Sequence, residues 1–219
     1  HQKLKKMQKT DDDKKKVSII EKAIQLISDE KKILGNLDKE EINYLNTYQL
    51  ISTKPVVYIC NVDENSALSG NEFTKKIDTY AKENNSEVLL ISAKIESEIS
   101  QITDFKDKQD FLESMGLKET GLKRVIKKGY EILNYINYFT AGEKELRAWT
   151  ITKGTLAPSA AGTIHSDMEK GFIRAETISF NDYLSHKGEA GAKEKGKLRL
   201  EGKEYEVKDG DIMHFLFNV

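Results

Sequence analysis

The chain has 219 residues, of which 38% are hydrophobic and 32% charged, a balance that predicts a soluble protein with more than one compact domain. Its 35 basic and 36 acidic residues nearly cancel, which excludes a global charge attraction to nucleic acid, and its single cysteine, Cys60, excludes an intramolecular disulfide or a cysteine metal cluster. No run approaches the ~20 apolar residues of a membrane span, so we expect a cytoplasmic protein without a membrane partner.

Residues 1–52 are predicted to form an incomplete coiled-coil helical hairpin, because apolar residues recur there at three- and four-residue steps. These apolar positions are Leu4, Met7, Val17, Ile20, Ile24 and Ile27. A charged stretch interrupts them, and we place the tip of the hairpin there, at residues 10–16. The first residue is not methionine, and we expect the chain to begin partway through a longer protein.

The predicted tip carries three adjacent lysines, Lys14, Lys15 and Lys16, directly after three aspartates. This stretch has no apolar face. It is either a solvated tip or a contact surface for an RNA or protein partner, and the sequence leaves both interpretations open.

Residues 53–134 alternate between strand and helix patterns. Strands are predicted up to Cys60 and over 87–91, and helices over about 70–84, 95–102, 107–115 and 120–134. Strands separated by helices indicate a parallel sheet with helices on its faces, so the predicted fold class is α/β. Such sheets bind ligands at the carboxyl ends of their strands.

Both predicted strands end in polar motifs that suit a purine base. The first ends in Asn61-Val62-Asp63-Glu64 and the second in Ser92-Ala93-Lys94. An amide and a carboxylate after one strand, beside a small-residue loop after the next, is how many P-loop NTPases present polar groups to a base. The Asn-x-x-Glu motif is weak by itself, and the loop after the second strand gives it weight.

Residues 135–219 change to short alternating strands, which predicts a separate module with the β-grasp fold of ubiquitin. Strands are expected over 136–140, 146–151, 172–180, 198–200 and 212–217, with helices near 157–164 and 181–186. Their aromatic residues Trp149, Phe172, Phe215 and Phe217 are predicted to be core rather than base-stacking platforms, because strand alternation accounts for them. His165 and His214 lack partners at metal-ligand spacing, so no metal site is predicted.

Residues 188–197 are predicted to be a mobile loop. Its Lys193, together with Lys170 and Arg174, would alternatively contact a phosphate backbone.

Several segments of the last 85 residues carry a family resemblance. They are Tyr138-Phe139-Thr140-Ala141-Gly142 and residues 147–150, 160–165, 169–176 and 209–219. They resemble the TGS domain at the end of the Obg-like ATPases of the YchF family. Asn61-Val62-Asp63-Glu64 is similar to that family's altered base-recognition motif, Ser92-Ala93-Lys94 to its second base loop, and residues 1–50 to its inserted coiled-coil hairpin.

The resemblance implies an ATPase that prefers ATP to GTP. GTPases carry Asn-Lys-x-Asp, whose aspartate accepts hydrogen bonds from guanine, whereas Val62 and Glu64 replace the lysine and the aspartate here. Asn61 would contact the base edge, Val62 would offer its backbone, and Ser92 and Ala93 would close the pocket. Ribosomes or RNA are the implied partners, and a monomer is expected.

The phosphate-binding half of such a site is missing from these residues. No Gly-x-x-x-x-Gly-Lys-Ser/Thr occurs, so no catalytic residue and no Mg²⁺ ligand is assigned to this chain, and ATP with Mg²⁺ is expected only for a longer protein. The competing hypothesis is a stand-alone RNA-, ribosome- or protein-binding module without a nucleotide role. A TGS-bearing synthetase or stringent-response enzyme is disfavoured, because neither has these two strand ends before its TGS module.

Overall fold

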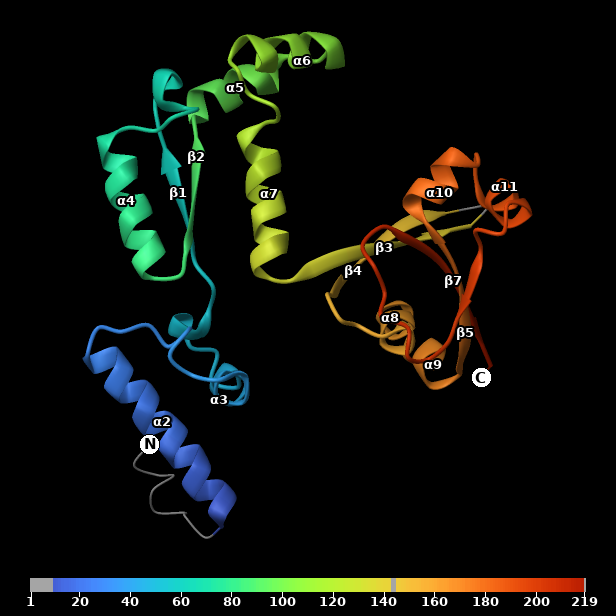
Figure 1. Cartoon of the computed structure of the whole chain (residues 1–219), viewed down its shortest axis with the longest axis horizontal. Coiled ribbons are helices and arrows are strands. Elements are labelled where there is room, and N and C mark those ends of the chain that lie inside the picture. The colour runs from blue at the N-terminus through green and yellow to red at the C-terminus, as the bar shows by residue number, and fades with distance from the viewer. Residues whose placement is uncertain (1–9, 143–144, 219) are drawn as a thin grey trace. The chain divides into compact units, whose positions relative to one another are not determined.

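The computed structural model describes residues 10–142 and 145–218 and divides the chain into two compact units, one ending at Lys128 and one starting at Gly129 (Figure 1). The predicted first arm of the hairpin, with Leu4 and Met7, lies outside the described residues. The predicted boundaries after residues 52 and 134 remain predictions.

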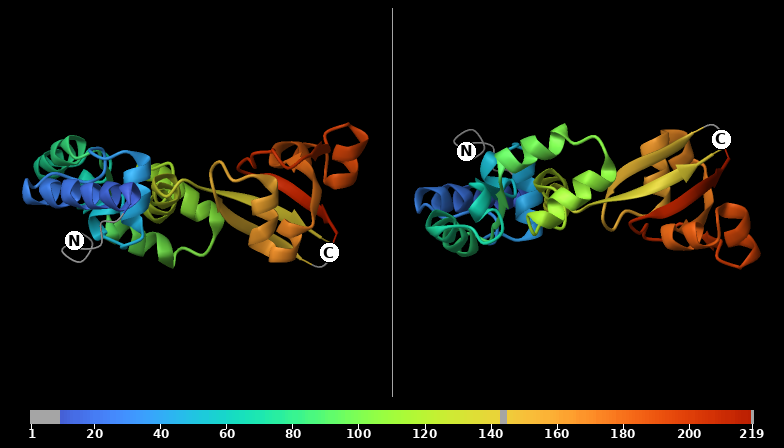
Figure 2. Two further views of the ribbon diagram at one scale, coloured as in Figure 1. Left: turned by 90° about the horizontal axis from the view of Figure 1, so that it is seen from below. Right: turned by 90° about the horizontal axis from the view of Figure 1, so that it is seen from above.

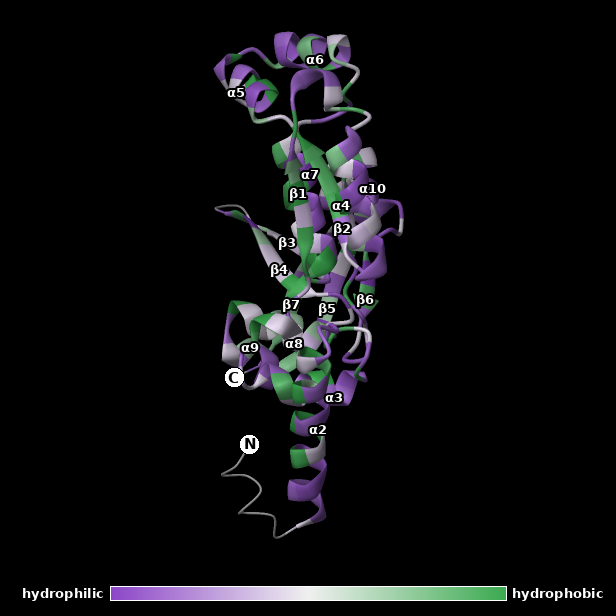
Figure 3. Cartoon of the chain, turned by 90° about the vertical axis from the view of Figure 1, so that its left-hand side faces the viewer, coloured by the Kyte–Doolittle hydropathy of each residue, from purple (hydrophilic) through white to green (hydrophobic). Residues whose placement is uncertain are grey.

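The first unit begins with helix α2 (Asp11–Ser28), which Thr10 caps. The Asp13 amide donates to Thr10 Oγ1 and the Thr10 amide donates to the Asp13 carboxylate, both at 3.1 Å, which forms a capping box. Three aspartates in the first turn also match the positive end of the helix dipole. The predicted tip is therefore wrong for residues 11–16, which form the hydrophilic first turns of α2 (Figure 3).

Helix α2 buries only part of the predicted stripe. Val17 of the stripe is buried and Ile20 is half-buried, whereas Ile24 and Ile27 are exposed. Ile19 and Ala23, outside the stripe, are buried as well. The small core beside α2 is built with helix α3 (Lys39–Asn46) and the loop before it, and it lies against Ile19 and Ala23. The apolar period in the sequence could not show which side of the helix this loop would cover.

Two parallel strands form the centre of the first unit, β1 (Val57–Asn61) and β2 (Glu87–Ile91), joined by helix α4 (Glu72–Glu83). Their register pairs Asn61 with Ile91, so both strands end at the same edge. The predicted strands and the helix between them are found within two residues of their expected ends.

Further short helices complete the first unit. They are η1 (Ile51–Thr53), η2 (Glu64–Ser66), α5 (Ala93–Gln101), α6 (Phe105–Ser114) and α7 (Gly121–Ile132), which runs into the second unit. A second small core packs α5 against α6 and the segment after η2. Among the described residues, no helix is long and apolar enough to cross a membrane.

The second unit contains a mixed five-stranded sheet in the order β4-β3-β7-β5-β6. Its strands are β3 (Tyr135–Ala141), β4 (Leu146–Thr152), β5 (Phe172–Ser179), β6 (Arg199–Glu201) and β7 (Asp211–Phe217). Strand β3 runs parallel to β7, and the other neighbours are antiparallel. Helix α8 (Ala157–Ile164) crosses one face of the sheet (Figure 2).

Three more helices lie in the second unit, α9 (Ser166–Lys170), α10 (Phe180–Ser185) and α11 (Glu189–Glu194). The prediction of a loop over 188–197 is wrong at α11, which buries Ala192 completely. Helix α9 was not predicted at all.

The core of the second unit lies between α8 and the sheet. Tyr138, Phe172 and Phe215 are buried there, and Trp149 packs against them partly buried. The core prediction is thus confirmed for Phe172 and Phe215 and wrong for Phe217, which is exposed at the end of β7.

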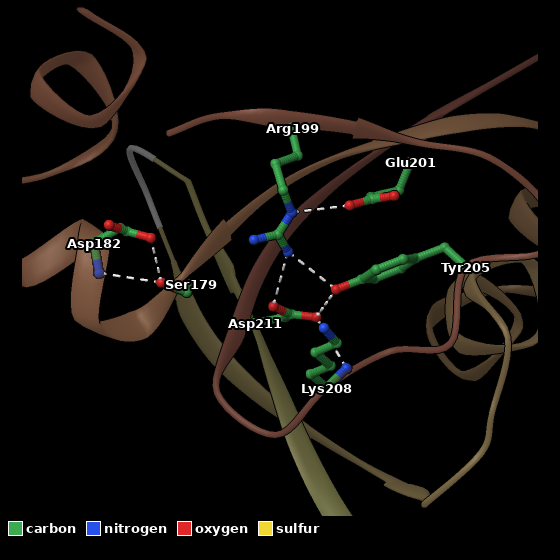
Figure 4. Close-up of polar contacts among 7 residues, drawn as sticks. All are labelled: Ser179, Asp182, Arg199, Glu201, Tyr205, Lys208 and Asp211. Atoms are coloured by element: carbon green, nitrogen blue, oxygen red, sulfur yellow. Dashed lines mark hydrogen bonds and ion pairs between the residues drawn. The ribbon is translucent and has the colours of Figure 1, made fainter. Parts of the chain in front are cut away.

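A polar network around the buried Asp211 lies beside this core, between β6, β7 and the loop that joins them (Figure 4). Asp211 is buried and accepts hydrogen bonds from the Tyr205 hydroxyl at 2.7 Å and the Lys208 amide at 2.9 Å. The guanidinium of Arg199 donates to the same hydroxyl at 3.0 Å and lies 3.5 Å from the Asp211 carboxylate. Burial and the bond to Asp211 raise the pKa of Tyr205. Because every one of these groups has a partner inside the unit, we assign the network to structure.

Candidate functional site

The candidate site lies at the shared carboxyl edge of β1 and β2. The Val62 amide donates to the Ile91 carbonyl at 2.8 Å, which carries the parallel pairing one residue beyond β1. The two predicted base-binding motifs therefore leave the sheet side by side.

Asn61 joins the two motifs. Its Oδ1 accepts a hydrogen bond from the Ala93 amide at 3.0 Å, although the two residues are far apart in sequence. Ala93 is the first residue of α5, so this bond fixes the start of that helix against the end of β1. With Oδ1 engaged, the donor available on the Asn61 side chain is its Nδ2 group.

Glu64 makes the second link between the motifs. Its Oε1 lies 2.6 Å from Lys94 Nζ, and the hydrogen bond and charge of Glu64 raise the pKa of Lys94. The lysine side chain is 69% exposed and the glutamate 35% exposed, so this ion pair contributes little to folding stability. The ion pair instead fixes the position of the Glu64 carboxylate, which it holds toward the Ser-Ala-Lys loop.

Asp63, which lies between Asn61 and Glu64 in the sequence, bonds to a nearby residue of its own loop. Its carboxylate accepts from the Ser66 amide at 2.9 Å and from the Ser66 hydroxyl at 3.1 Å, which caps η2. Of the two acids of this motif, Glu64 is thus the one that reaches the Ser-Ala-Lys loop.

Ser92 is placed differently from its predicted neighbour Ala93. Ser92 is only 4% exposed, and its Oγ is buried without a hydrogen-bond partner among the described residues, whereas Ala93 is exposed. A ligand at this edge would meet Ala93 rather than the hydroxyl of Ser92.

Two residues that sequence reasoning missed support the loop from behind. Arg124 of α7 donates from Nη2 to the Leu90 carbonyl, just before the loop. Glu96 accepts from the first amides of α7, those of Gly121 at 2.6 Å and Leu122 at 3.1 Å. A carboxylate at a helix N-terminus is a favourable charge arrangement. No local spacing in the sequence signals either contact, because α5 and α7 are separated by α6.

The three lysines predicted as an RNA-contact surface lie together on α2, but each pairs with an acid. Lys14 lies 2.8 Å from Asp11, Lys15 lies 2.8 Å from Glu40, and Lys16 contacts Asp12. The hydrogen bonds that Lys15 donates to Glu40 and Lys16 donates to Asp12 raise the pKa of both lysines. The carboxylates cancel much of the positive field that an RNA phosphate would meet.

The other predicted contacts do not form one patch. Lys170 ends α9, Arg174 lies on β5 and Lys193 lies on α11, and all three are exposed. Figure 1 shows α9 and α11 at opposite ends of the second unit.

No group of three His, Cys, Asp or Glu side chains in the described part of the chain could hold a metal ion. His165 instead accepts from the Asp167 amide at 3.2 Å as the cap of α9.

Comparison with known proteins identifies the class. The family YchF-GTPase_C, described as a protein of unknown function (DUF933), matches residues 135–218. The structure of the Schizosaccharomyces pombe YchF GTPase superposes with a TM-score of 0.85 at 32% identity, covering 98% of this chain and 60% of that one. The fold is thus the mixed α/β fold of a YchF GTPase.

Relatives of similar sequence identify the family of the chain. The "Ribosome-binding ATPase YchF" of Haemophilus ducreyi is 47% identical over 209 residues, which are 95% of this chain and 57% of that protein. The protein of the same name from Bacillus subtilis is 51% identical over 183 residues, 83% of this chain and 50% of its own length. The chain belongs to the YchF family, and its match spans about half the length of these relatives.

Proposed function

We propose that this chain supplies the base-recognition end of an ATP site in a YchF-type ribosome-binding ATPase. The observation that carries the proposal is the hydrogen bond from the Ala93 amide to Asn61, which joins the two strand ends into one rim. The names of the relatives, which call them ribosome-binding ATPases, support the same function.

The backbone at Val62 favours adenine over guanine. The Val62 amide is engaged with the Ile91 carbonyl, so the group that Val62 offers to a base is its own carbonyl, an acceptor. Adenine carries an exocyclic amino donor where guanine carries a carbonyl oxygen, also an acceptor. A carbonyl at this position therefore attracts the amino group of adenine and repels the oxygen of guanine.

Glu64 reinforces this preference. In the GTPase motif the acid accepts from the ring N–H and the amino group of guanine, but here Lys94 holds the longer Glu64 side chain at 2.6 Å. A carboxylate already bound to an ammonium is a weaker acceptor for guanine, which removes the main source of guanine selectivity.

Asn61 tests the location of the site. In the full-length protein, Asn61→Ala should weaken ATP binding by roughly 5- to 100-fold, the range of one good polar contact to a base. Asn65→Ala is the matched control, because Asn65 is an exposed asparagine in the adjacent η2. Calorimetry with Mg²⁺ present measures the ATP affinity of both variants. Equal affinities would show that the base does not bind at this edge of the sheet.

Phosphate binding, Mg²⁺ and hydrolysis belong, in this proposal, to parts of the longer protein outside these residues. The proposal rests on the sequence, which lacks a phosphate-binding glycine loop with its Mg²⁺-binding Ser or Thr. The chain by itself should be inactive as an ATPase.

Residues 135–219 are proposed to be a TGS module of the β-grasp fold that contacts ribosomes or RNA in the cytoplasm. Lys170, Arg174 and Lys193 are the proposed contacts in this module. Charge reversal to Glu at these three positions should weaken cosedimentation of the full-length, monomeric protein with ribosomes, and most strongly at low salt. The same test on Lys14, Lys15 and Lys16 should give a smaller effect, because acids already pair with them.

The alternative is a binding module for RNA, ribosomes or protein with no nucleotide role. This alternative would be supported if the full-length protein binds ribosomes but shows no ATP binding by calorimetry.

A further inference from the structure

A cleft lies in the second unit, among residues that the structure describes. It has a volume of about 720 Å³, within the usual range of ligand pockets. Its apolar lining comes from Trp149, Ile164, Met168, Met213, Phe215 and Phe217, and its polar lining includes Glu145, Arg147 and His214.

The cleft exists because β3 and β7 separate. Their pairing in the described residues is confined to Phe139 and Ile212, and β7 continues from there to Phe217. Figure 1 shows the two strands diverging beyond this point. Strand β3 is paired with β4 on its other side, and β7 with β5, so each strand turns one main-chain edge toward the cleft.

Arg147 marks the polar side of the cleft. Its guanidinium lies 4.2 Å from the centre of the Trp149 ring, a cation–π contact, and its side chain is 57% exposed. Glu145 lies 3.8 Å away, too far for a hydrogen bond. Arg147 is therefore held in place by the tryptophan while its hydrogen-bond donors remain available to a carboxylate.

We propose that this cleft binds an extended peptide of a protein partner, which adds as a strand along the β7 edge and places an acidic side chain against Arg147. An unpaired sheet edge is a template for main-chain hydrogen bonds with an extended chain. Alternate side chains of that peptide point to one face, where the apolar lining receives them. The next side chain faces the rim, where Arg147 lies.

An RNA ligand fits this cleft less well. Phosphate contacts need clustered cations, and the lining carries one arginine together with one glutamate. The ring of Trp149 is also already covered by Arg147, which competes with stacking of a base.

The sole tryptophan of the chain gives a direct assay, because Trp149 lines the cleft and no other tryptophan contributes to the emission. The 219-residue chain is titrated with the peptide Val-Thr-Val-Glu-Val-Thr-Val, blocked at both ends, and with the same peptide carrying Lys in place of Glu. The acidic peptide should shift the Trp149 emission and bind about 2- to 5-fold more tightly, the range of one opposite-charge pair across strands. A version of the acidic peptide with N-methyl groups at alternate amides should not bind.

Charge reversal supplies the second test. Arg147→Glu should reverse the preference, so that the lysine peptide binds more tightly, while Lys203→Glu, at an exposed position that does not line the cleft, should leave it unchanged. Three results would each overturn the proposal: no emission change with either peptide, equal binding of the N-methylated peptide, or saturable binding of a single-stranded RNA octamer at Trp149 where the peptides fail. If Arg147→Glu does not fold, the comparison of the peptides on the unmodified chain still tests whether the cleft binds an extended acidic peptide.

Discussion

Replacing Tyr138 by phenylalanine removes one hydroxyl from the core of the second unit, at a cost that the contacts define. Tyr138 is 0% exposed, and its hydroxyl donates to the Ala160 carbonyl at 2.9 Å and lies 3.0 Å from Thr163 Oγ1. Thr163 Oγ1 also donates to that carbonyl at 2.7 Å, so the carbonyl keeps a partner in the variant. We expect Tyr138→Phe to lower the free energy of unfolding by about 1 kcal/mol at pH 7, the low end of the range for a lost buried hydrogen bond.

The pH dependence of this cost gives a sharper test. Burial raises the pKa of Tyr138 to about 12. In the unfolded chain the same phenol loses its proton near pH 10, so the unfolded state binds fewer protons above that pH and the stability of the wild type falls as the pH rises from about 10 to 12. At pH 11 the loss is about 1.4 kcal/mol. The phenylalanine variant has no such loss, so its stability should equal or exceed that of the wild type near pH 11.

Urea unfolding followed by Trp149 emission at pH 7, 9, 10 and 11 measures the gap between the two proteins. Tyr135→Phe is the control, because Tyr135 is exposed on the same strand and should show a small, constant difference. A gap between wild type and Tyr138→Phe that stays constant from pH 7 to pH 11 would refute the reasoning.

Three further outcomes are expected. Phe215→Ala should cost about 3–5 kcal/mol in urea unfolding followed by Trp149 emission, and Phe217→Ala about 1 kcal/mol or less, because only the first is buried; similar costs would contradict the assigned core. Glu96→Ala should cost about 1–2 kcal/mol in the unfolding of the first unit measured by circular dichroism, while the exposed Glu98→Ala should be nearly neutral; equal costs would show that the cap on α7 is not what Glu96 contributes. The 219-residue chain should bind ATP weakly or not at all by calorimetry, since most nucleotide affinity in such sites comes from phosphate contacts, and tight binding would contradict the division of the site.

Elements with a strong local signal were predictable. The apolar runs before Asn61 and Ser92 and the helix over Ala157–Ile164 are found at or within two residues of their expected ends. Elements stabilised by short-range polar contacts were not. The first turns of α2 were predicted as a charged tip although Thr10 and Asp13 have the spacing of a capping box. Helix α11 was predicted as a loop because only one of its residues, Ala192, is buried.

The proximity of the two predicted motifs could be read from the sequence, and their contacts could not. Parallel pairing of β1 and β2 brings Asn61 to Ala93 and Glu64 to Lys94, and the motifs suggested their proximity. The burial of Ser92 was not visible, because it depends on how α5 and α7 pack behind the loop.

Base selectivity of the full-length protein tests the proposed site most directly. The measurement is the ratio of the dissociation constants for ATP and GTP, with Mg²⁺ present, in the wild type, in Val62→Lys, in Glu64→Asp and in the double variant. We expect the wild type to favour ATP, because the Val62 carbonyl suits adenine and Lys94 holds Glu64, and the double variant to shift toward GTP more than either single change. A wild type that favours GTP about tenfold, or ~1.4 kcal/mol, would contradict the adenine site, and a double variant with an unchanged ratio would move selectivity away from these two residues.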